Sequence, residues 1–145
     1  RVMSIEQTMT DTCKEDLLTG DVEFDSDSFK IALFTSAATL NAATALYETG
    51  MTGEVSDTDT NYTEGGNTLT GAAVAVADNV AYVDFADTTW ASSTFTARGA
   101  LIYNTSNSNA SVAVLDFGSD KTSSNSTFTV TFPAAGSTSA VIRIQ

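Results

Sequence analysis

Apolar and polar residues alternate along the second half of the chain. In Ser126–Phe132, residues Phe128, Val130 and Phe132 fall on one face and the intervening threonines on the other. A period of two is typical of a half-buried antiparallel strand. Phe29–Phe34 is instead dense in aliphatic and aromatic residues throughout. This composition predicts a strand in the centre of a sheet.

Further short segments of this kind follow at close spacing, with turn-forming residues between them. The predicted strands are Thr68–Val76, Val80–Phe85, Thr94–Tyr103, Ser111–Phe117, Ser126–Phe132 and Ala140–Ile144. The predicted turns are Ala77–Asn79, Asn104–Asn109 and Ser119–Asn125. Many short strands without intervening helices favour an all-β fold. We therefore predict an antiparallel β-sandwich, jelly-roll or immunoglobulin-like, of about seven or eight short strands with one N-terminal helix.

The N-terminal segment Ser4–Leu18 carries the helical pattern. Ser4 is a suitable N-cap, Gln7 lies three residues later in the capping-box position, and Gly20 is a natural stop. Cys13 falls on the weak apolar stripe of this helix, so we interpret it as a small buried hydrophobic residue.

Length and composition predict one domain over residues 1–145, with a helical arm at 1–20 and the β-sandwich at 28–145. Ser36–Thr49 is rich in alanine and could form a short helix or a loop. Gly50–Gly71 is a long polar stretch, and loops of this length in a compact domain are usually functional or assembly segments.

Charge narrows the range of partners. The chain has 18 acidic and 6 basic residues, a net charge of −12. Binding to nucleic acid requires clustered Lys and Arg, so direct nucleic-acid binding is not expected, and neither is binding to an anionic membrane. Threonine, serine and asparagine supply much of the remaining polar surface, and such a surface suits packed assembly because few charges are desolvated on contact.

Side chains that commonly take part in catalysis are scarce in the sequence. Without histidine there is no nucleophile–histidine triad, and we predict neither an enzyme nor a cofactor or metal requirement. Asp84 and Asp116 are formally a carboxylate pair of the kind that glycosidases use, but both follow strands, where aspartates commonly cap turns.

Two acidic segments are candidate cation sites. Asp21–Asp27 has four acids and could bind a cation, but we favour a solvated acidic edge that discourages strand aggregation. Asp57–Asn61 resembles the start of a calcium loop. The sixth position of this segment is Tyr62 instead of glycine, and the twelfth is Thr68 instead of glutamate. We therefore reject a calcium-binding loop here.

Aromatic residues offer a further candidate surface. Trp90, Tyr62 and Tyr103 could form a face on which carbohydrate stacks, because aromatic rings are flat apolar platforms. We favour the interpretation that they are core anchors beneath the loops.

Four segments resemble a family of small structural proteins from the virions of tailed bacteriophages. The segments are Phe29–Phe34, Tyr62–Gly71, Val83–Trp90 and Ala97–Asn104, and the likeness extends over most of the chain from Phe29 to Ile144. The resemblance implies assembly into a virus particle formed in the cytoplasm of a bacterial host. It does not distinguish the capsid surface from the tail.

On this basis we expect a capsid decoration or cement protein that docks on the major capsid protein, as a homo-oligomer such as a trimer. The helix Ser4–Leu18 or the acidic segment Asp21–Asp27 would make the contact. A neck or tail component, such as an adaptor or fibre-attachment protein, is the alternative within the virion. A carbohydrate-binding or filament-forming β-sandwich is the alternative of another class, with Ala140–Ile144 as the strand donated to a neighbouring subunit.

Overall fold

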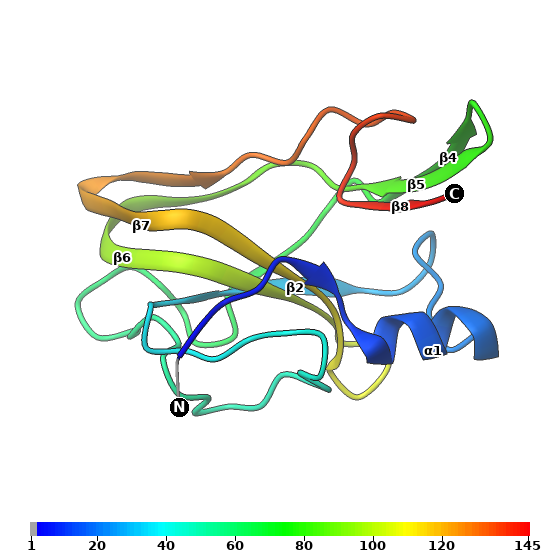
Figure 1. The fold of residues 1–145 in the computed structure, drawn as a ribbon. Coiled ribbons are helices and arrows are strands. Elements are labelled where there is room, and N and C mark those ends of the chain that lie inside the picture. The colour runs from blue at the N-terminus through cyan, green and yellow to red at the C-terminus, as the bar shows by residue number, and fades with distance from the viewer. Residues whose placement is uncertain (1–2) are drawn as a thin grey trace.

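The computed structural model describes residues 3–145, which form two antiparallel β-sheets and one short helix in a sandwich-like arrangement (Figure 1). The larger sheet has the strand order β1-β7-β6-β2-β3 and the smaller one β4-β5-β8. The elements are β1 (Thr8–Met9), α1 (Asp11–Thr19), β2 (Phe29–Phe34), β3 (Asn67–Thr68), β4 (Ala73–Ala77), β5 (Val80–Asp84), β6 (Thr88–Asn104), β7 (Ala110–Val130) and β8 (Ile142–Ile144). The prediction of an antiparallel β-sandwich with an N-terminal helix is confirmed.

One long hairpin, β6–β7, dominates the molecule. Figure 1 shows that both strands bend sharply at one end of the molecule, so that one half of the hairpin lies over the other half. Register shifts interrupt the ladder, and Ser92, Gly118 and Asn125 have positive φ angles, as is usual at bulges. The hairpin therefore supplies residues to both layers. Ile102, close to the turn that joins the two strands, and Phe128, near the open end of the hairpin, belong to the same core cluster.

The predicted turn Ser119–Asn125 is wrong. Ser111–Phe117 and the first part of Ser126–Phe132 belong to a single strand, β7, and the residues between them pair with β6. Thr122 lies opposite Thr96, and their hydroxyls are hydrogen-bonded at 2.8 Å. Most of this segment is polar because it is exposed to water, and the chain does not reverse there.

The start of the predicted helix Ser4–Leu18 is also wrong. The helix begins at Asp11, after Thr10, whose hydroxyl accepts a hydrogen bond from the Cys13 N–H. The residues before it are extended: the Ser4 carbonyl accepts from the Leu40 N–H at 3.0 Å, and β1 pairs with β7. The predicted stop is confirmed, since Gly20 is the C-cap with φ 82°.

The other strands lie where they were predicted, with one extension and one division. Thr94–Tyr103 is the second part of β6, which begins six residues earlier at Thr88. Phe29–Phe34 is confirmed residue for residue as β2. Thr68–Val76 is divided into β3 and β4, and Gly71, with φ +66°, lies between them. Ser36–Thr49 is a loop without a helix. The end of Ala140–Ile144 forms β8, which pairs with β5 of the same chain.

The core lies between the layers and is rich in aromatic rings. Trp90, Phe95 and Phe128 pack against one another with ring centroids 4.9–6.4 Å apart. A second cluster, which includes Phe34, Leu40 and Val114, packs between the larger sheet and the loops outside it. Buried side chains therefore anchor the loops outside the larger sheet to that sheet.

Candidate functional site

The carboxylates considered as a catalytic pair lie in different sheets. Asp84 ends β5 in the smaller sheet, and its buried Oδ1 has no hydrogen-bond partner. Asp116 is on β7 in the larger sheet, where its Oδ1 accepts hydrogen bonds from the Gly118 N–H at 2.8 Å and from Arg98 Nε at 3.2 Å. Asp116 therefore fixes the bulge at Gly118, as expected of an aspartate that caps a turn.

We expect Asp116→Asn to reduce stability at neutral pH but not in acid. The Gly118 N–H and the Arg98 guanidinium lower the pKa of the Asp116 carboxyl. A carboxyl with a lowered pKa in the folded state stabilises that state above its unfolded pKa of about 4, and this stabilisation is lost as the pH falls through the folded value. Because the pair is partly exposed, the effect should stay below ~1 kcal/mol.

Urea unfolding at pH 7 and near pH 2 measures this difference. Asp120→Asn, which removes the same charge from an exposed position on the same strand, is the matched control. A difference between wild type and D116N that is equally large at both pH values would contradict the assignment.

The aromatic candidates are core residues. Trp90, Tyr62 and Tyr103 are only 4%, 3% and 2% exposed, which confirms the interpretation as core anchors. Tyr62 and Tyr103 also hold a loop in place. The Tyr62 hydroxyl accepts from the Leu33 N–H at 3.0 Å, and the Tyr103 hydroxyl donates to the Gly65 carbonyl at 2.7 Å.

Glu54 is the centre of a polar cluster that sequence reasoning missed. Its Oε1 accepts hydrogen bonds from the Tyr62 hydroxyl at 2.8 Å and from the Gly65 N–H at 2.7 Å. Its Oε2 accepts from the Tyr47 hydroxyl at 2.9 Å, and the Tyr47 ring stacks on Tyr103 at 4.4 Å. Nothing in the sequence near Glu54 signals this convergence, because it depends on how the loop Gly50–Gly71 folds back on itself.

The three tyrosines of this cluster remain protonated at physiological pH. Burial raises the pKa of Tyr103 to about 12 and raises the pKa values of Tyr47 and Tyr62 as well. A protonated phenol can donate a hydrogen bond, so Tyr47 and Tyr62 both donate to the Glu54 carboxylate. The cluster therefore fastens the long loop Gly50–Gly71 to the sheet.

The acidic segment Asp21–Asp27 is ordered by its own hydrogen bonds. Asp27 Oδ2 accepts from the Glu23 N–H at 3.0 Å and from Asn104 Nδ2 at 2.7 Å. Within residues 3–145, no three His, Cys, Asp or Glu side chains are grouped so that they could hold a metal ion. Cys13 is 1% exposed, as predicted, and burial raises the pKa of its thiol to about 12.

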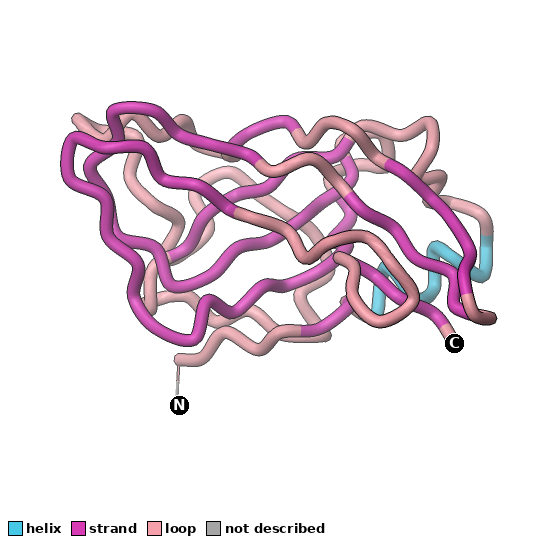
Figure 2. Tube along the Cα trace, turned by 90° about the horizontal axis from the view of Figure 1, so that it is seen from above, coloured by secondary structure: helices cyan, strands magenta, loops and turns pink. Residues whose placement is uncertain are grey.

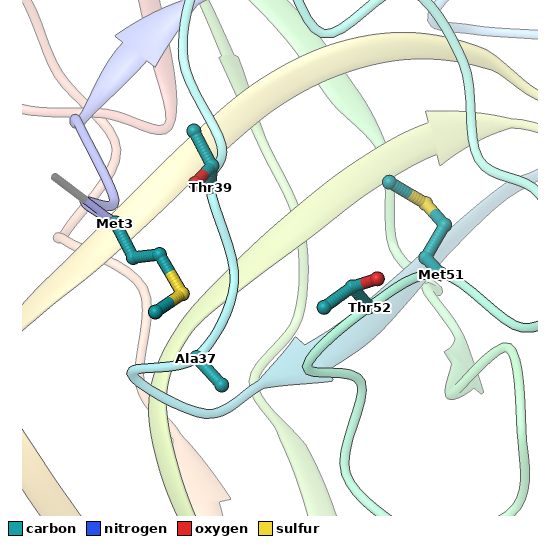
Figure 3. A pocket seen from close by; sticks show the side chains of 5 residues that line it. All are labelled: Met3, Ala37, Thr39, Met51 and Thr52. Atoms are coloured by element: carbon teal, nitrogen blue, oxygen red, sulfur yellow. The ribbon is translucent and has the colours of Figure 1, made fainter. Parts of the chain in front are cut away.

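A shallow pocket lies between the N-terminal segment and two loops (Figure 3). Figure 3 shows Met3 and Ala37 on one side and Met51 and Thr52 on the other, with Thr39 above. The lining residues include no ionisable side chain, and their polar side chains are those of two threonines. Specific small-molecule sites usually combine apolar walls with several converging polar groups, and this pocket lacks that combination.

Exposed apolar side chains gather at one end of the molecule. Figures 1 and 2 place α1, the β4–β5 hairpin and the C-terminal strand β8 at that end. Four large hydrophobic residues are exposed there: Leu18 (90%), Val74 (54%), Val76 (72%) and Ile144 (47%). Val74 and the loop Val22–Ser26 line a common open pocket, so β4 lies near the segment that follows the helix.

In the part of the chain that the structure describes, no helix is long and apolar enough to cross a membrane. Comparisons of the chain with protein-family models, with curated proteins and with solved structures find no match.

Proposed function

We propose that this chain is a structural protein of a tailed-phage virion, a decoration or cement protein that docks on the outer face of the capsid shell. The resemblance of its sequence segments to phage virion proteins supports the proposal, as does the β-sandwich fold. The observation that carries it is the exposed end of α1. Leu18, in the last turn of this helix, is 90% exposed.

Leu18 lies among carboxylates that lack basic partners. Glu15 and Asp21 are exposed, and the last turn of α1 contains no basic residue. Burial raises the pKa of Asp16, and the charges of Asp21 and Glu15 raise it further. Negative charge at the C-terminal end of a helix is also unfavourable because it opposes the helix dipole.

A basic partner surface would relieve this repulsion. The chemistry fits an apolar pocket for Leu18 with Lys and Arg at its rim, because a central apolar anchor with a polar rim is the usual anatomy of a docking site. We infer that the major capsid protein presents such a pocket on the outside of the shell.

The alternatives of another class lose their structural support. Trp90, Tyr62 and Tyr103 are buried, so they offer no platform for a carbohydrate. β8 is the strand that a filament would donate to a neighbouring subunit, but it pairs with β5 of its own chain. The paired residues are Ala81 with Ile144, Tyr82 with Arg143 and Val83 with Ile142.

The proposal is tested by the copy number of this chain in purified particles. Quantitative mass spectrometry against the major shell protein should give a ratio near one to one for a decoration protein. A few copies per particle would instead support the neck or tail alternative, and absence from particles would discard the virion assignment.

Within the proposal, we expect Leu18→Ser to weaken binding to shells that lack this protein by at least about tenfold, the loss of ~1.4 kcal/mol expected for a central anchor. Co-sedimentation with shells at increasing salt measures the effect. Wild-type binding should weaken with salt, because the rim contacts are ionic. Leu46→Ser, at a 40% exposed leucine elsewhere on the surface, is the matched control. Equal binding by L18S and wild type would contradict docking through α1.

A further inference from the structure

An open groove lies between the loop that follows α1 and the exposed face of β4. Its volume is about 550 Å³, within the range of ~300–1,000 Å³ that is usual for sites that bind small groups. Figure 1 shows the loop between α1 and β2 at the same end of the molecule as β4 and β5. The groove is lined by Val22, Glu23, Phe24, Asp25, Ser26 and Val74.

The loop side of the groove is apolar and fixed in place. Val22 and Phe24 are only 8% and 6% exposed, and the Phe24 ring stacks on Phe29 with centroids 5.1 Å apart. The Asp27 N–H donates to the Glu23 carbonyl at 2.8 Å, and the Glu23 N–H donates to Asp27 Oδ2 at 3.0 Å. A groove that is already formed lowers the entropic cost of binding.

The rim of the groove is acidic. Glu23 and Asp25 are exposed, and the only hydrogen bond to either carboxylate within residues 3–145 is from the Ser26 hydroxyl to Glu23 at 2.7 Å. The two ion pairs in that part of the chain are elsewhere, at Lys14–Asp11 and Arg98–Asp116. The groove therefore combines apolar walls with two carboxylates that lack a basic partner.

Such a groove has the chemistry to bind a long cationic side chain. Lysine and arginine pack their alkyl stems on apolar surface and keep the charged head at the edge. Val74, which is 54% exposed, offers apolar area for the stem opposite Val22. The net charge of −12 attracts a basic surface and repels a second copy of this chain.

We propose that this groove binds a lysine or arginine side chain of the surface on which α1 docks. The inference rests on the proposed function for the identity of that surface. The groove is continuous with the proposed contact, because only Thr19–Asp21 separates Leu18 from Val22. Leu18 then enters the partner, and a cationic side chain of the partner enters this chain, so the two anchors are reciprocal.

A small probe tests the groove without any shell. Butylammonium has the alkyl stem and the ammonium group of a lysine side chain. Titrated into the wild-type chain, it should shift the amide NMR signals of Val22–Ser26 and Val74. We expect 1-butanol, which has the same stem without the charge, to bind at least about threefold more weakly, the factor that an exposed ion pair contributes.

Matched variants separate the walls from the rim. Val74→Ser should weaken butylammonium binding, whereas Val76→Ser should not, because Val76 is exposed on the same strand but does not line the groove. Asp25→Asn should weaken it by about threefold. Glu48→Gln, which removes a charge from an exposed residue of another loop, should not. Absence of shifts at Val22–Ser26, equal binding of 1-butanol, or equal losses in V74S and V76S would overturn the proposal.

Co-sedimentation with shells that lack this protein tests the identity of the partner. D25N should bind shells about threefold more weakly than wild type, and its binding should depend less steeply on salt. If L18S loses binding and D25N binds like wild type, the groove takes no part in docking, and this inference fails while the proposed function stands. Failure of the wild-type chain to bind shells would contradict the proposed function, whereas the butylammonium titration decides on the groove by itself.

Discussion

Replacing Gly66 with alanine will strongly destabilise the folded protein. Gly66 has φ +75°, and a Cβ built on it would lie 1.7 Å from the Ile31 carbonyl oxygen and 2.8 Å from the Cα of Ala32. Both atoms belong to the backbone of β2, which is held between β3 and β6. The clash can be relieved only by moving the loop or breaking the β2 ladder.

The expected loss of unfolding free energy is at least ~4 kcal/mol. About 1 kcal/mol comes from the left-handed backbone conformation, and the remainder from the clash with a strand that cannot shift. Since small domains are stable by only about 5–15 kcal/mol, a loss of this size removes a large part of the stability. Urea unfolding followed by near-ultraviolet circular dichroism measures the loss.

Gly50→Ala is the matched control for this prediction. Gly50 lies in the same loop with φ +80°, but a Cβ there would meet no atom within 4 Å. It should therefore cost only ~1 kcal/mol, from the backbone conformation alone. A loss in G66A no larger than in G50A would show that the loop does not approach β2 as closely as the structure describes.

The parts of the fold that sequence patterns predicted are those with local signals. The dense apolar run Phe29–Phe34 became β2 without a change of bounds, and Gly20 ended the helix as expected. Asp78 and Asn79, both of which tolerate positive φ, marked the turn between β4 and β5. In each case a few neighbouring residues determine the conformation, so a single sequence carries enough information.

The errors arose where a distant partner decides between two local alternatives. Ser119–Asn125 has the composition of a turn, but an exposed strand can have the same composition, and pairing of Thr122 with Thr96 makes it strand. Ser4 and Thr10 are both good helix caps. Pairing of β1 with β7 and the contact of Ser4 with Leu40 leave only Thr10 free to start the helix.

The cluster around Glu54 also has no local signal in the sequence. In the sequence, nothing distinguishes Tyr47 and Tyr62 from other aromatic residues in polar loops, or Glu54 from an ordinary surface acid. Only the folded path of the long loop brings their side chains together. The exposure of Leu18 was not predicted either: this residue falls outside the apolar stripe that contains Cys13.

Replacing Glu54 with alanine should destabilise the protein by ~3 kcal/mol and loosen the loop Gly50–Gly71. The change removes the acceptor of the Tyr47 and Tyr62 hydroxyls and of the Gly65 N–H. Each buried donor left without an acceptor costs about 1–3 kcal/mol. The total should be less than the sum of three such costs, because water can enter a half-buried site and replace part of the lost bonding.

Urea unfolding gives the loss in stability, and hydrogen exchange of the Gly65 amide reports the loosening of the loop. Glu54→Gln retains one acceptor oxygen and should lose less than E54A. Glu64→Ala is the matched control, because Glu64 is an exposed residue of the same loop with one hydrogen bond, from the Gly50 N–H at 2.8 Å. It should cost ~1 kcal/mol or less and leave Gly65 protected. If E54A and E64A lose the same stability and Gly65 remains protected in both, Glu54 does not fasten the loop.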